Sequence, residues 1–189
     1  MKIGVYIGSF NPVHKGHIKI ANYIANNNLV DKLLIIPSFD YWDKKISVSL
    51  EDRVNMLKFY EKENIVIDSE FSHLKYTYQL INSLKEKYKN DDFCLILGAD
   101  NIVNFDKWKN YKELLQLELI IVKRNGIDIL YYLKKLGKNN NYIIVKELDE
   151  MNISSTMIRD NIENTDFIKQ YLDDEVIDYI VKKRLYRKW

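Results

Sequence analysis

Short apolar segments alternate with amphipathic segments along nearly the whole chain, and this alternation constrains the fold more than any other feature. Each apolar segment is short and continuously hydrophobic, as strands covered on both faces usually are. The pattern predicts strands at residues 2–8, 31–37, 64–68, 92–98, 118–123 and 141–146.

The intervals between these strands carry apolar residues at helical spacing. Strands that alternate with helices form parallel sheets with right-handed crossovers. The sequence therefore predicts an α/β fold with a parallel sheet, helices on both faces and a C-terminal helical subregion. Because ligands bind at the carboxyl ends of such strands, functional residues should directly follow them. Helices are expected at residues 17–27, 49–62, 76–89, after Ser154, and at 173–186.

The composition is typical of a globular protein and gives little support to membrane or nucleic-acid binding. Apolar residues make up 47% and charged residues 30% of the chain, and the formal net charge is +2. No apolar run is long enough to span a membrane, and the N-terminus lacks the features of a signal peptide, so we expect a cytoplasmic protein. The single cysteine, Cys94, cannot form an internal disulfide and is expected in a buried strand. The oligomeric state stays open, including a homo-oligomer.

The segment GSFNPVHKGH, from Gly8 to His17, joins the first strand to the first helix. A glycine-containing turn before a helix N-terminus favours anions, because backbone N–H groups and the helix dipole point toward the ligand. His14 and His17 are three residues apart and lie on one helix face, so both can contact one bound group. A zinc pair is the alternative, but the sequence has no HExxH motif and only one other histidine. The pattern therefore favours a phosphate site without a protein-bound metal.

A second anion site is expected after the last strand, in the segment ISSTMIR. Ser154 or Ser155 can cap a helix there, and Arg159 lies about one turn further on. A guanidinium at this position can bind phosphate oxygens with two hydrogen bonds. An ordinary capped helix with a solvated arginine is the alternative interpretation.

These two segments resemble the HxGH and ISSTxIR signatures of the nucleotidylyltransferase superfamily. The resemblance implies a Rossmann-like fold over a single domain, residues 1–189, with ISSTxIR and the C-terminal helices from about residue 153 onward. It also implies that His14 and His17 contact the ATP phosphates and that Arg159 holds the β- and γ-phosphates. Gly98 and Asp100, which follow the fourth strand, are expected at the adenosine. The residues expected to bind ATP are Gly8, Ser9, Phe10, His14, His17, Gly98, Asp100, Ile153, Ser154, Ser155 and Arg159.

The middle of the chain resembles the bacterial nicotinate mononucleotide adenylyltransferases. The resemblance implies a phosphate-binding lysine at Lys44, although Tyr41, Trp42 and Asp43 depart from the family's PPHK-like loop and Lys45 could substitute. It places Thr77 beside the nicotinate ring and Trp108 stacked upon it. A cation at Lys109 would suit the carboxylate of nicotinate better than an amide. The residues expected at the acceptor are Lys44, Thr77, Trp108, Lys109 and Arg124.

The implied reaction moves the adenylyl group of ATP to nicotinate mononucleotide and releases pyrophosphate. His14, His17, Lys44 and Arg159 are the expected catalytic residues, and magnesium should accompany ATP, bound mostly by phosphates and water. Arg53, in EDRVNML, resembles the family's HRxxML and is either structural or functional. Nicotinamide mononucleotide or another small phosphate acceptor is the alternative substrate. A non-catalytic nucleotide-binding module is the alternative class, and its mark would be a broken HxGH or a lost Arg159.

Overall fold

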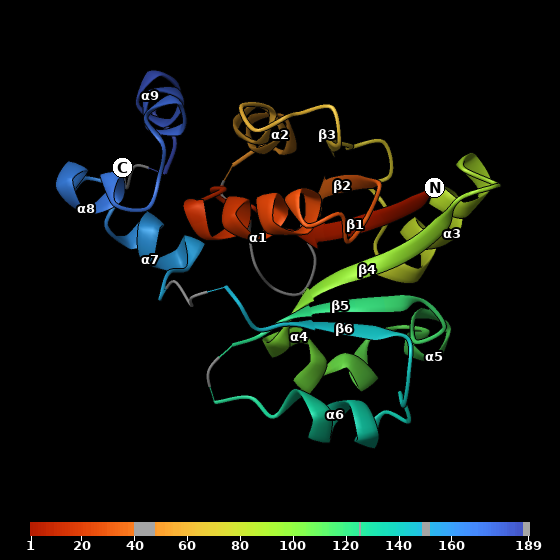
Figure 1. Ribbon diagram of the computed structural model, residues 1–189. Coiled ribbons are helices and arrows are strands. Elements are labelled where there is room, and N and C mark those ends of the chain that lie inside the picture. Colours follow the sequence, from red (N-terminus) through yellow and green to blue (C-terminus); the bar gives the residue numbers. More distant parts are fainter. Residues whose placement is uncertain (40–47, 125, 149–151, 187–189) are drawn as a thin grey trace.

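The computed structural model describes residues 1–39, 48–124, 126–148 and 152–186 (Figure 1). Its strands form one six-stranded sheet in the order β3-β2-β1-β4-β5-β6, and every neighbouring pair is parallel. The predicted strands are confirmed to within one residue at each end. They are β1 (Lys2–Gly8), β2 (Lys32–Pro37), β3 (Ile65–Ile67), β4 (Asp92–Gly98), β5 (Glu118–Val122) and β6 (Tyr142–Val145).

The sequence predicted the long helices and the short helix after Ser154, but not the other short helices. The sequence did not indicate α4, α5, α6 and α8, which have only four to seven residues each and are too short to show a helical period. The helices are α1 (Lys15–Asn26), α2 (Leu50–Lys58), α3 (Thr77–Lys87), α4 (Ala99–Val103), α5 (Tyr111–Leu114), α6 (Ile129–Lys135), α7 (Ser155–Asp160), α8 (Thr165–Lys169) and α9 (Asp174–Lys183), with a 3₁₀ turn, η1, at Phe105–Lys107.

Two apolar clusters, one on each face of the sheet, form the core. Helices α1, α2 and α7 to α9 contribute to one cluster, and α3 to α6 contribute to the other. The Rossmann-like prediction of helices on both faces is therefore confirmed. Cys94 is fully buried in β4, as expected.

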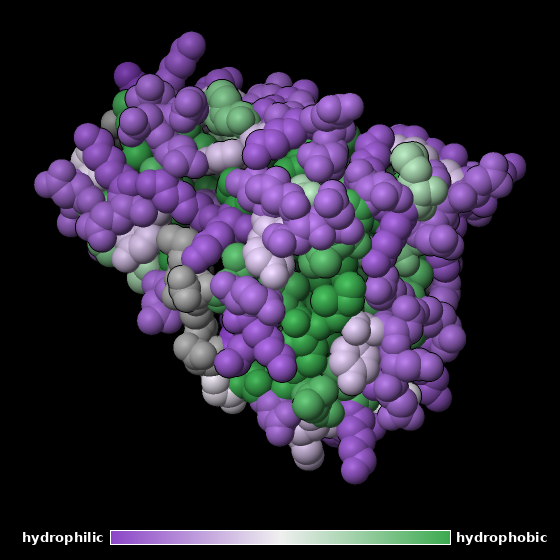
Figure 2. Space-filling model, viewed as in Figure 1, coloured by the Kyte–Doolittle hydropathy of each residue, from purple (hydrophilic) through white to green (hydrophobic). Residues whose placement is uncertain are grey.

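Figure 2 shows mostly polar side chains on the viewed face, with an apolar strip open over the β5–β6 half of the sheet. The partly buried Ile143 of β6 packs against the first core cluster. None of the described helices is both long enough and apolar enough to cross a membrane.

The C-terminal helices lie beside the carboxyl ends of the strands, close to the start of α1 (Figure 1). The Lys15 N–H donates to the Tyr171 carbonyl at 2.9 Å, which joins the start of α1 to the chain between α8 and α9. The Tyr179 hydroxyl donates to Asp52 at 2.9 Å and so joins α9 to α2. These contacts hold the C-terminal helices against α1 and α2 at the carboxyl edge of the sheet.

Candidate active site

A cleft of about 700 Å³ opens at the carboxyl edge of the sheet, between the turn after β1 and the start of α7. His14, His17 and Arg159 all line it, although Arg159 is more than 140 positions from either histidine in sequence. The two predicted phosphate-binding segments therefore face one cavity. The lining residues are Ser9, Asn11, His14, His17, Ser38, Phe39, Asp100, Arg124, Ile153, Ser154, Ser155, Thr156 and Arg159.

The turn after β1 fixes both histidine rings. His14 is the N-cap of α1, and its N–H donates to Nδ1 of His17 at 3.3 Å. The two rings stack with centroids 3.6 Å apart, and Phe10 meets His17 edge-on at 4.9 Å. Because Nδ1 of His17 accepts a hydrogen bond, the proton of a neutral His17 resides on Nε2. His17 can therefore donate from Nε2.

The surroundings of both histidines favour the neutral imidazole, because they lower the pKa of each ring. Burial, followed by the nearby Arg124 cation, lowers the pKa of His14 from 6.5 to about 4. Burial also lowers the pKa of His17 well below 6.5, and the neighbouring His14 and Arg124 add to this effect. An anionic ligand in the cleft would oppose these shifts, because it favours the protonated imidazole.

The lowered pKa of His14 predicts a pH-dependent stability. The unfolded chain binds this proton more readily than the folded chain does. The stabilisation is therefore fully present above pH 6.5 and is lost as the pH falls toward about 4. We expect the stability advantage of the wild type over His14→Gln to shrink by about 2 kcal/mol between pH 7 and pH 5. Urea unfolding at both pH values measures this difference, and equal losses in the two proteins would contradict the assignment.

The start of α7 contacts the turn after β1 directly. The Ser154 side chain caps α7 by accepting from the Met157 N–H at 3.1 Å, as predicted. The Ser155 hydroxyl donates to the Pro12 carbonyl at 2.9 Å. Arg159 donates from Nη1 to the Asn11 carbonyl at 2.7 Å and from Nη2 to the Thr156 hydroxyl at 3.0 Å. The guanidinium carries five N–H groups, so it has further donors for a ligand.

Gly98 ends β4 and leaves room for an ion pair at the cleft. Nε of Arg124 lies 3.0 Å from Oδ1 of Asp100, and both side chains are substantially exposed. A Cβ atom added at Gly98 would come within 2.5 Å of Oδ1 of Asp100, so the exposed Asp100 carboxylate would have to move and the ion pair would shift. Gly8 has a similar role at the end of β1, where a Cβ would lie 3.0 to 3.3 Å from the Phe10 ring.

A second cavity, of about 520 Å³, lies on the other side of α4. Asp100 lines the first cleft and its neighbour Asn101 lines the second, so adjacent residues of α4 border the two cavities. Trp108 packs against Phe105 with ring centroids 5.1 Å apart. The cavity offers aromatic, amide and cationic groups, and none of the described residues lines it with an acidic side chain. Its lining residues are Lys75, Tyr76, Thr77, Asn101, Asn104, Lys107, Trp108 and Lys109.

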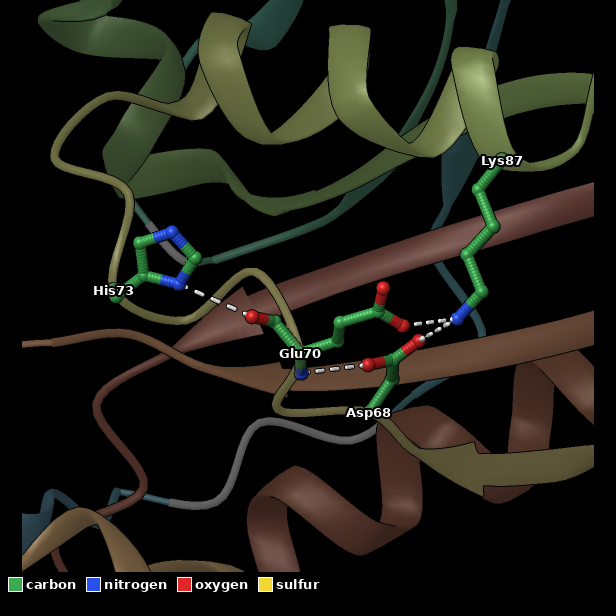
Figure 3. A network of polar contacts seen from close by, with 4 residues as sticks. All are labelled: Asp68, Glu70, His73 and Lys87. Carbon is green, nitrogen blue, oxygen red and sulfur yellow. Dashed lines mark hydrogen bonds and ion pairs between the residues drawn. The ribbon is translucent and has the colours of Figure 1, made fainter.

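A polar network holds the segment that leads from β3 to this second cavity (Figure 3). Lys87, near the end of α3, pairs with the carboxylates of Asp68 and Glu70. The Glu70 N–H donates to Asp68 at 2.9 Å, and Nδ1 of His73 lies 3.1 Å from the Glu70 carbonyl. These contacts hold residues 68–73 against α3, the helix that begins at Thr77.

The structure divides the predicted site residues between the two cavities. Thr77, Trp108 and Lys109 all line the second cavity. Arg124, which was expected at the acceptor, instead lines the first cleft with the histidines. Gly8 and Phe10 frame that cleft without lining it. Lys44 and its alternative Lys45 lie outside the described residues.

Several lining residues were not predicted. Asn11 and Thr156 line the first cleft from within the two segments that were assigned to phosphate, and Ser38 lines it from the position just after β2. For Asn11 and Ser38, the position beside a strand end was the available indication. Asn101 and Asn104 line the second cavity from α4 and its C-terminal end. They could not be assigned because the sequence did not reveal α4.

No group of three or more histidine, cysteine, aspartate or glutamate side chains suited to a metal ion occurs in the described ranges. Asp100 is the carboxylate that lines the first cleft, and it already pairs with Arg124. This donor set fits a magnesium ion that enters with a triphosphate and is held mainly by phosphate oxygens and water.

The fold, together with the cleft that the two predicted phosphate-binding segments line, defines a nucleotidyltransferase. Residues 5–161 match the Cytidylyltransferase-like family. Among curated proteins, a probable nicotinate-nucleotide adenylyltransferase of Fusobacterium nucleatum is 36% identical, over 97% of this chain and 98% of that protein. One from Flavobacterium psychrophilum is 33% identical over the whole length of both. The chain belongs to the nicotinate-nucleotide adenylyltransferase family.

A solved structure supports the same relationship. The nicotinic acid mononucleotide adenylyltransferase of Plasmodium falciparum, complexed with NaAD, superposes with a TM-score of 0.84 at 27% identity. The match covers 98% of this chain and 97% of the other. The same enzyme complexed with APC superposes with a TM-score of 0.80.

Proposed function

We propose that this enzyme transfers the adenylyl group of ATP to nicotinate mononucleotide, giving deamido-NAD and pyrophosphate. The observation that carries the proposal is the single cleft that His14, His17 and Arg159 line from opposite ends of the sequence. An intact histidine pair and an intact Arg159 argue against a non-catalytic nucleotide-binding module. We also propose a cytoplasmic location and a single domain over residues 1–189.

In the proposed complex, the triphosphate lies between the turn after β1 and the start of α7. His17 donates from Nε2 to the α-phosphate, and Arg159 donates to the β- and γ-phosphates. Asp100 accepts hydrogen bonds from the ribose hydroxyls after its ion pair with Arg124 breaks. Ile153 and both histidines also line a small adjoining pocket of about 40 Å³, which we assign to the start of the adenine site.

The transfer needs no general base, because the acceptor phosphate is already an anion. One of its oxygens attacks the α-phosphorus, and the bond from that phosphorus to the β-bridging oxygen breaks. The protein aligns the two phosphates and places hydrogen-bond donors where charge develops. A bound magnesium ion would supply charge neutralisation to the triphosphate and the leaving pyrophosphate.

We assign the acceptor to the second cavity. The aromatic face of Trp108 can stack on the pyridine ring, and Thr77 lies at the N-terminus of α3, where anions are favoured. Lys75, Lys107 and Lys109 surround the same cavity. This cationic rim suits a carboxylate better than a neutral amide.

We expect Lys109→Ala to lower the preference for nicotinate mononucleotide over nicotinamide mononucleotide about three- to fivefold. The lysine is exposed, so its attraction to one carboxylate is worth about 1 kcal/mol. The ratio of kcat/KM values for the two acceptors measures the effect. Lys112→Ala is the matched control, because Lys112 is exposed nearby but does not line the cavity. An unchanged ratio in Lys109→Ala would remove its assigned role.

Incubation with ATP, magnesium and nicotinate mononucleotide tests the proposed function. We expect deamido-NAD and pyrophosphate in equal amounts and no adenylylated protein. Nicotinamide mononucleotide and phosphopantetheine serve as competing acceptors in parallel reactions. Absence of product from all three acceptors, together with measurable ATP binding, would favour a non-catalytic nucleotide-binding module.

A further inference from the structure

Three backbone carbonyls of the turn after β1 are held by side chains from other segments. The Ser9 carbonyl accepts from Nη1 of Arg53 at 2.8 Å. The Asn11 carbonyl accepts from Arg159, and the Pro12 carbonyl accepts from the Ser155 hydroxyl. Donors from α2 and from α7 therefore hold the carbonyls of this turn in place.

Arg53 holds the turn from within the protein. It lies on α2 and is only 2% exposed, so it cannot reach a ligand in the cleft without rearrangement. The same Nη1 atom donates to the Ser38 carbonyl at 2.7 Å. Ser38 follows β2, and its own N–H donates to the Gly8 carbonyl at 2.8 Å. Arg53 thus joins the segments that follow β1 and β2, and Ser9 and Ser38 both line the cleft.

The turn needs such support because its backbone conformation is unfavourable. Phe10 has a φ of 44°, in the left-handed region that residues with a Cβ atom rarely adopt. Such a conformation persists only where the surroundings fix it. Ser9 and Asn11, the residues before and after Phe10, each have a carbonyl that accepts from a guanidinium, that of Arg53 and that of Arg159 respectively.

The arrangement also decides which backbone groups are left for a ligand. Within the described part of the chain, the N–H groups of Ser9, Phe10 and Asn11 donate to no protein acceptor. Side-chain donors satisfy the carbonyls of Ser9 and Asn11, whereas the N–H groups of the same residues remain available to an anion. A different backbone conformation at Phe10 would exchange some of these N–H groups for carbonyls, which repel phosphate.

We propose that Arg53 is a positioning residue for adenylyl transfer: it fixes the phosphate-binding conformation of the turn after β1 without touching the substrate. This inference rests on the proposed function and adds to it a buried residue that acts through Ser9 and Ser38. Loss of the Arg53 contacts should misalign the triphosphate, and a displacement of about 1 Å can cost about 100-fold in rate.

The test compares Arg53→Met and Arg53→Lys with Lys138→Met. Lys138 is a matched control because it is also buried and also donates to two carbonyls, those of Leu115 and Leu117, before β5 and away from the cleft. We expect Arg53→Met to lower kcat about 10- to 100-fold and to weaken binding of a non-hydrolysable ATP analogue, while the KM for the acceptor changes less than threefold. Lys138→Met should lower Tm to a similar extent but leave kcat and ATP-analogue binding within about twofold.

Arg53→Lys retains a cationic donor and should recover part of the lost kcat; it also carries the test if Arg53→Met does not fold. Equal kcat values in wild type and both Arg53 variants would overturn the inference. A kcat loss in Lys138→Met as large as that in Arg53→Met would also overturn it, because the effect would then follow stability alone. An inactive wild type would instead refute the proposed function.

Discussion

His17→Asn is expected to lower kcat about 100- to 1000-fold, which is the typical cost of one lost donor at a developing charge. The asparagine amide can still accept a hydrogen bond from the His14 N–H, as Nδ1 of His17 does at 3.3 Å. It cannot reproduce the Nε2 donor that we assign to the α-phosphate. The variant therefore separates the catalytic donor from the contact that fixes the start of α1.

Single-turnover rates at saturating ATP and acceptor measure this loss. Urea unfolding of the same variant provides the control, because its stability at pH 7 should stay close to that of the wild type. A kcat within about threefold of wild type would show that His17 does not serve the α-phosphate.

Arg159→Met is expected to lower kcat/KM for ATP about 100- to 1000-fold. Methionine preserves much of the side-chain volume but removes every guanidinium donor. The loss has two sources, since Arg159 is assigned to the β- and γ-phosphates and also holds the Asn11 carbonyl at 2.7 Å. Initial rates over a range of ATP concentrations measure it.

Thr156→Val is the matched control for Arg159→Met. It removes only the hydroxyl that accepts from Nη2 of Arg159 at 3.0 Å, and the guanidinium keeps its contact with Asn11. We expect kcat/KM for ATP to stay within about threefold of wild type. Comparable losses in the two variants would mean that the Thr156 contact, and not the charge of Arg159, matters for ATP.

The sheet was predictable because each strand is a separate apolar run. Strands covered on both faces cannot contain many polar residues, so the β4 segment Asp92–Gly98 is visible in the sequence without any partner. The short helices are different. Helix α5 has four residues and begins after Asn110, whose φ is 54°, and tertiary packing rather than sequence periodicity determines such a turn.

Most of the residues that line the first cleft were predictable because their segments follow strand ends. His14, His17 and Arg159 lie in two compact motifs, and the parallel topology brings the motifs to one edge. Arg53 shows the limit of this reasoning. Its position in α2 does not indicate that it contacts the carbonyls of Ser9 and Ser38, because those contacts depend on how α2 packs against the sheet.

The sequence also could not predict how the candidate site residues are distributed between the two cavities. Arg124 follows β5 and was expected at the acceptor, but the neighbouring β4 brings Asp100 close enough to pair with it. Such a contact depends on strand order, which here places β5 beside β4. The apolar periodicity of a strand does not indicate which other strand lies next to it.

A crystal structure with a non-hydrolysable ATP analogue tests the central claim most directly. The account predicts an α-phosphate within hydrogen-bonding distance of Nε2 of His17, and β- and γ-phosphates in contact with Arg159. Density for the triphosphate at any other place, with both histidines and Arg159 free of phosphate, would contradict it.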